Sequence, residues 1–119
     1  MTERYNVEYG LLWGAMTADW GDIQPNDSFG KDLNEFSHEA IDVYDNAMMI
    51  IALDYLEKVV PDPYKKAKWA QMSDEFSTNT RRYLWDVENA KFIPHIYPSG
   101  SPIPTGFDEN QIFYHGGTA

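Results

Sequence analysis

Cysteine is absent from the sequence, and basic residues are scarce. The first absence excludes disulfides, thiolate catalysis and zinc sites built from cysteine. Basic residues are outnumbered by acidic ones, because the chain has nine Lys and Arg but nineteen Asp and Glu, which gives a formal net charge of −10. Because like charges repel, we expect neither nucleic acid nor an anionic membrane surface as a partner.

Long apolar runs are also missing. No run approaches the roughly 20 residues that cross a bilayer. The first seven residues are polar, and the apolar patch at 11–13 is too short for a secretory signal. We therefore expect a soluble chain with no signal peptide, cytoplasmic by default. The three histidines have no metal-ligand spacing and no glycine-rich phosphate loop is present, so we expect no metal site and no cofactor.

The composition that remains is that of a folded protein. The chain has 119 residues, of which 43% are hydrophobic and 15% aromatic. This suffices for one modest domain with a real core, or for a piece of a larger one. At the N-terminus, apolar residues at the odd positions 5, 7, 9 and 11 indicate a short extended segment.

Two helices are predicted in the middle of the chain. The first runs from about 38 to 60 and carries an apolar stripe at helical spacing, formed by Tyr44, Met48, Ile51, Tyr55 and Val59. It is apolar over much of its circumference, so we expect more than one neighbour to bury it. The second runs from about 63 to 84, where Asp62 can cap and Pro63 suits the first turn.

The short link at 61–62 predicts an antiparallel helical hairpin. After it, two apolar runs flank the turn-like centre 88–90, which predicts a small β-hairpin within residues 83–97. The expected fold class is therefore mainly α: a helical hairpin with flanking loops and one small β-hairpin.

The stretch 17–25, with sequence TADWGDIQP, holds the candidate chemistry. It places two carboxylates, Asp19 and Asp22, beside the indole of Trp20. This combination is typical of sites that bind and cleave sugars, where one carboxyl group acts as an acid and a ring stacks on the sugar. The alternative is structural: a surface turn whose aspartates cap their own backbone.

The order of these features resembles one repeat of the six-hairpin (α/α) toroid found in many glycoside hydrolases. The residues that carry the resemblance are the runs 18–22 (ADWGD), 41–47 (IDVYDNA) and 83–86 (YLWD). Glycogen-debranching, processing-glucosidase-like and cellobiose-phosphorylase-like enzymes belong to this superfamily. The resemblance implies that residues 1–119 are a single domain or a fragment of a larger toroid catalytic domain.

The resemblance also implies roles for individual residues. Asp22 would be the general acid, since 22–25 (DIQP) is similar to the acid-bearing turn of the glucosidase-like members. Asp19, Trp20, Asp42 and Trp13 would bind substrate, an oligosaccharide of the α-glucoside type. The base that activates water usually comes from a late hairpin of the toroid, so the chain alone should be nearly inactive.

Two alternatives come from other functional classes. The first is a small helical module without catalysis that associates with itself, with a partner or with the rest of a larger protein through its apolar helix. The second is a non-catalytic sugar-binding domain that uses Trp13 and Trp20. Asp42 also has a structural alternative, because acidic residues are favoured in the first turn of a helix.

Overall fold

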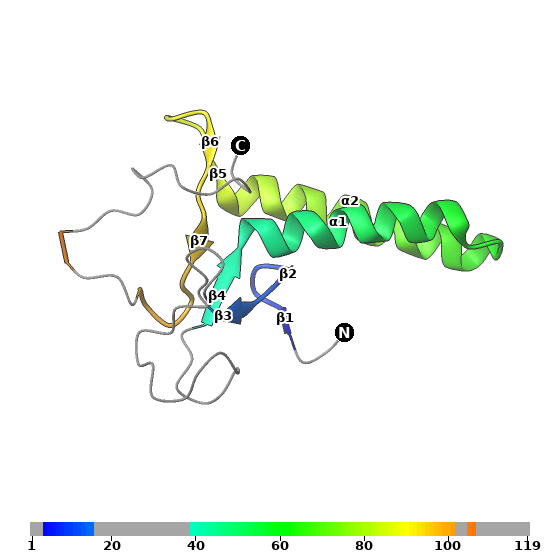
Figure 1. The fold of residues 1–119 in the computed structure, drawn as a ribbon, viewed down its shortest axis with the longest axis horizontal. Coiled ribbons are helices and arrows are strands. Elements are labelled where there is room, and N and C mark those ends of the chain that lie inside the picture. The colour runs from blue at the N-terminus through cyan, green and yellow to red at the C-terminus, as the bar shows by residue number, and fades with distance from the viewer. Residues whose placement is uncertain (1–3, 16–38, 102–104, 107–119) are drawn as a thin grey trace.

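Two helices and seven short strands make up the fold of the computed structural model, which describes residues 4–15, 39–101 and 105–106. The helices lie side by side as an antiparallel pair (Figure 1). The strands gather around the end of this pair where the first helix begins and the second ends. Most of the side chains with polar tertiary contacts lie at this end.

Helix α1 spans Val43–Val59 and helix α2 spans Pro63–Leu84. The link between them is short because Asp62 caps α2, accepting hydrogen bonds from the backbone N–H groups of Tyr64 and Lys65. Pro63 occupies the first turn, where its missing N–H costs no hydrogen bond. The predicted bounds of the second helix and the predicted helical hairpin are both confirmed.

The predicted start of the first helix is wrong. Residues Glu39–Asp42 form strand β4, and α1 begins only after it. Asp42 has extended dihedral angles (φ −95°, ψ 137°) and its side chain accepts the backbone N–H of Asp45, as an N-cap does. Ala40 and Ile41 are fully buried in β4, so tertiary packing overrides the helical pattern of this stretch.

The strands form three antiparallel groups. Strand β1 (Tyr5–Asn6) pairs with β2 (Leu11–Leu12), and β5 (Trp85–Asp86) pairs with β6 (Lys91–Phe92). Strand β4 lies between β3 (Gly14–Ala15) and β7 (His95–Ile96) in a three-stranded sheet. The hairpin predicted within 83–97 is confirmed as β5–β6.

The expected fold class is wrong. The described residues form a small mixed α/β unit, in which short strand pairs brace one end of a helical pair, and this is not the architecture expected of a toroid repeat. Strands β3, β4 and β7 could not be read from the sequence pattern, because each pairs with a partner distant in the chain. Ile41, for example, lies opposite Ile96.

The core lies between the helical pair and the N-terminal strands. Its fully or nearly fully buried members are Leu11, Ile41, Val43, Leu53, Phe76 and Leu84. Helix α2 contributes Phe76, which is buried, and its Trp69 and Met72 pack against the core. The apolar stripe of α1 does not pack there. Tyr44, Met48, Ile51, Tyr55 and Val59 are all exposed, so the expected burial by several neighbours is not found within the described residues.

Candidate functional site

Three buried polar residues, Asp42, Asn46 and His95, lie where β2, β4 and β7 meet the first turn of α1. Asp42, which ends β4, is 8% exposed. One carboxylate oxygen caps α1, and the other lies 3.0 Å from Nε2 of His95 on β7. The two strands are held in register here, because Val43 N–H donates to the carbonyl of Pro94 over 3.0 Å. Asp42 therefore ties the helix to the sheet.

The position of Asp42 gives its carboxylate a structural role. Both oxygens already have partners within the protein. The resemblance assigned Asp42 to substrate binding, and that role stays a prediction. His95 gave no signal in the sequence, since its partner lies 53 positions earlier. Its ring also stacks on Tyr97, with centroids 5.6 Å apart.

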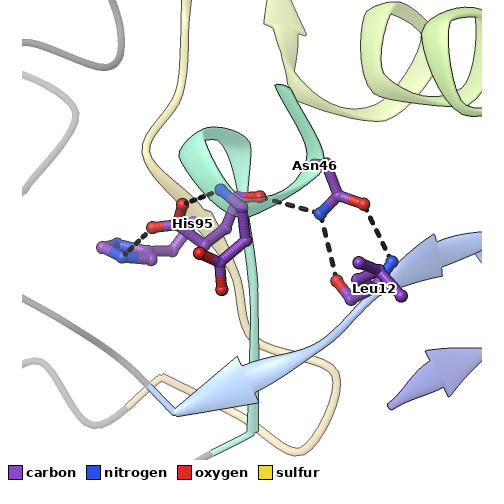
Figure 2. Close-up of polar contacts among 5 residues, drawn as sticks. Leu12, Asn46 and His95 are labelled. Atoms are coloured by element: carbon purple, nitrogen blue, oxygen red, sulfur yellow. Dashed lines mark hydrogen bonds and ion pairs between the residues drawn. The ribbon is translucent and has the colours of Figure 1, made fainter. Parts of the chain in front are cut away.

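Asn46 is the most completely buried polar side chain of the cluster, with 0% exposure. Its Oδ1 accepts the N–H of Leu12 over 2.8 Å, and its Nδ2 donates to the carbonyl of Leu12 over 3.0 Å (Figure 2). Nδ2 also donates to the carbonyl of Asp42 over 2.8 Å. A single amide thus mimics a strand partner for β2 and fastens it to α1. An Asn in a largely apolar helix was the only sequence signal for this role.

A side-chain hydrogen bond also joins the N-terminal hairpin, formed by β1 and β2, to α2. The side-chain amide of Asn79 donates to the carbonyl of Gly10 over 3.2 Å. Gly10 has φ +63°, and a Cβ atom there would lie 2.5 Å from Nδ2 of Asn79. Glycine is favoured at this turn by its left-handed backbone, and a larger residue would also have to displace the amide of Asn79.

Trp13 follows directly after β2. It is half-buried and packs against the hydrophobic core, and its backbone N–H donates to the carbonyl of Arg4 over 2.9 Å. This packing is what a core tryptophan does. Its predicted use as a sugar platform stays a prediction.

The other candidate residues, Asp19, Trp20 and Asp22, lie outside the described residues. The structure does fix the residues that flank them. Ala15 and Glu39 face each other as partners in the antiparallel β3–β4 pair. Glu39 is further held by Asn6, whose side chain donates to its carboxylate over 3.1 Å. The two residues that flank the segment 16–38 therefore lie side by side in one strand pair.

A shallow groove runs between the helices near β6. Its volume is about 200 Å³, and it is lined largely by apolar side chains together with Ser77, Thr80 and Arg81. Ligand pockets usually span about 300–1,000 Å³. The groove is below that range, so we assign no ligand to it.

Charged groups elsewhere have local roles. Two hydrogen bonds from Asn89 lower the pKa of Asp86 from its ordinary value of 3.8, and the bond from the Asn89 side chain has a larger effect than the bond from its backbone N–H. The backbone N–H of Glu88 and the positive charge of Lys91 also lower this pKa. These bonds define the turn between β5 and β6.

Among the residues that the structure describes, no three His, Asp or Glu side chains form a group that could hold a metal ion. Neither described helix is long and apolar enough to cross a membrane.

Comparison of the chain with protein-family models, with curated proteins and with solved structures gave no match. Its function therefore has to be inferred from its own residues.

Proposed function

We propose that this chain is the part of a glycoside hydrolase that supplies the general acid and part of the sugar-binding cleft. Asp22 protonates the leaving oxygen of the glycosidic bond, Trp20 stacks on the apolar face of the sugar ring, and Asp19 holds hydroxyl groups. The substrate class is an oligosaccharide of the α-glucoside type. The chemistry requires an acid that is protonated at working pH beside an apolar ring, and the stretch 17–25 brings those residue types together.

The observation that supports this proposal is the pairing of Ala15 with Glu39. It anchors both flanks of the segment that contains the three candidate residues. Catalytic and binding residues are disproportionately found on loops that a rigid scaffold positions. Here the scaffold is the fold next to Ala15 and Glu39. It is stabilised by the Asp42–His95 contact between β4 and β7, and by the three hydrogen bonds of Asn46, which join α1 to β2 and β4.

Hydrolysis also needs a second carboxylate, which either activates water or attacks the sugar. The two carboxyl groups stand roughly 6.5–9.5 Å apart in inverting enzymes and about 5–5.5 Å apart in retaining ones. In this proposal the second carboxylate belongs to polypeptide that completes the cleft. The chain by itself then has little or no turnover.

The experiment measures sugar release from a panel of glucose oligosaccharides by the protein and its variants. Asp22→Asn should lower any measured rate by about 10²- to 10⁴-fold, the usual contribution of a general acid. Asp62→Asn is the matched control, because it removes a carboxylate at the far end of the hairpin while asparagine still caps α2. Hydrolysis that survives Asp22→Asn unchanged would overturn the proposal.

A second candidate function is favoured by the exposed apolar stripe of α1. In this alternative the chain is a helical interaction module, and the stretch 17–25 is a surface turn. Asp22→Asn separates the two candidates, since a module keeps its full affinity for its partner when this carboxyl group is replaced.

A further inference from the structure

Helix α1 carries an apolar surface that nothing in the described structure covers. We name it the α1 stripe and define it by six exposed residues that run from the first turn of the helix to the last: Tyr44, Met48, Ile51, Ala52, Tyr55 and Val59. Tyr55 is 65% exposed and Val59 is 70% exposed. On a helical projection the six fall within about a third of the circumference, and no charged residue lies among them.

The size of the α1 stripe is large for a chain of this length. Its side chains expose on the order of 600 Å² of mostly apolar surface, of which the two tyrosines supply the largest share. The largest apolar patch on a typical monomer is about 300–600 Å² and is often functional. A standard interface buries about 800 Å² on each partner. The α1 stripe with its margins therefore approaches the area that a stable dimer needs.

We propose that the α1 stripe packs against the α1 stripe of a second copy of this chain, with the two helices antiparallel. Two helical hairpins would then form a four-helix bundle. The spacing of 4, 3 and 4 residues from Tyr44 to Tyr55 is the seam of helices that cross at about 20°. This inference goes beyond the proposed function, and sugar chemistry at residues 17–25 does not depend on it.

The α1 stripe is complementary to itself. A two-fold axis placed between Ile51 and Ala52 sets every member opposite another apolar member. The opposed pairs are Tyr44 with the partner's Val59, Met48 with the partner's Tyr55, and Ile51 with the partner's Ala52. Larger side chains thus meet smaller ones at the two ends and at the centre, as well-packed interfaces require.

Charge sets the expected salt dependence. Asp45 is exposed at one margin of the α1 stripe. Lys58 is exposed at the other margin, where its ammonium lies 5.6 Å from the ring centroid of Tyr55. The central residues Ile51 and Ala52 bring no charge into the interface. Each copy nevertheless has a formal charge of −10, and two such copies repel. Salt screens this repulsion, with a Debye length of about 10 Å at 0.1 M. Added salt should therefore strengthen self-association, whereas it would weaken the binding of a basic partner.

Molar mass in solution tests the proposal, measured by light scattering after size exclusion at several salt concentrations. The unaltered chain should have twice the monomer mass of 13.7 kDa, and its dissociation constant should fall as salt rises. Ile51→Glu should give a monomer with unchanged helical circular dichroism, since Ile51 is exposed in the isolated chain. Val87→Glu is the matched control, because Val87 is 80% exposed in the turn between β5 and β6, and it should stay dimeric.

Cross-linking tests the geometry, because a chain without cysteine accepts one thiol at a chosen place. Ala52→Cys lies next to the proposed axis and should form a disulfide-linked dimer under mild oxidation, whereas Val87→Cys should not. A monomer at all salt concentrations would overturn the proposal. So would a dimer that survives Ile51→Glu, or equal cross-linking at both positions.

Discussion

Replacing Asn46 by alanine should unfold the N-terminal strands and weaken the whole domain. The substitution removes three hydrogen bonds made by a side chain that has no solvent exposure of its own. It leaves the N–H and C=O groups of Leu12 without the amide that pairs with them in the folded chain. Each buried group left unsatisfied costs about 1–3 kcal/mol. The carbonyl of Asp42 loses less, because the carbonyl of an N-cap residue also accepts the first backbone bond of its helix.

The two bonds to Leu12 are only part-buried, so each of its groups should cost about 1–2 kcal/mol, in the lower part of that range. The expected loss for Asn46→Ala is therefore about 2–4 kcal/mol of unfolding free energy. This is a large share of the roughly 5–15 kcal/mol that stabilises a typical protein. Asn46→Asp preserves the size of the side chain and the acceptor for Leu12. It replaces the donor with a second oxygen that faces two carbonyl groups, so at neutral pH it should destabilise at least as much as alanine.

Urea unfolding followed by circular dichroism measures these losses. With a slope of about 2 kcal/mol per molar, the midpoint for Asn46→Ala should fall by about 1–2 M. Asn89→Ala is the control of the same chemistry, because the side chain of Asn89 bonds only in an exposed turn. If both variants lie within about 0.5 kcal/mol of each other, the structural reasoning for Asn46 is wrong.

Three further predictions concern local interactions. Asn89→Ala removes the main hydrogen bond to Asp86, so NMR titration should show the pKa of Asp86 rise toward 3.8. Because the pKa of Asp86 is lower in the folded than in the unfolded chain, its carboxylate stabilises the fold at pH values above the unfolded pKa. This contribution to the unfolding free energy is lost as pH falls through the folded pKa, so Asn89→Ala should make stability less dependent on pH in that acid range. Gly10→Ala should lower the melting temperature, with a cost of roughly 1–3 kcal/mol from its positive φ and the contact with Asn79. Asp62→Ala should cost about 1 kcal/mol in urea unfolding, while Asp62→Asn should cost little.

Local signals in the sequence were sufficient for α2 and for the β5–β6 hairpin. Asp62 and Pro63 mark the start of α2 because capping and proline act within a few residues. Strand β4 could not be predicted in this way. Its conformation depends on pairing with β3, which precedes it by 25 positions, and with β7, which follows it by more than 50.

The candidate site shows the same division. The structural alternative for Asp42 placed it in the first turn of the helix, where the dipole favours acidic residues, and the structure makes it the N-cap instead. The partners His95 and Leu12 lie far along the chain, so neither contact could be inferred from spacing. The pattern of α1 predicted an apolar stripe correctly, but periodicity alone does not say what covers such a stripe. The roles of Asp22, Trp20 and Asp19 stay predictions.

The most direct test of the proposed function is a titration of the chain with malto-oligosaccharides, followed by tryptophan fluorescence. Binding does not require the second carboxylate, so it tests the sugar site even where turnover is absent. The account predicts a saturable change in emission that is lost in Trp20→Ala. The change should persist in Trp85→Ala, whose ring packs on Phe92 with centroids 4.9 Å apart. The absence of saturable binding, or equal losses in the two variants, would contradict the claim that this chain binds carbohydrate.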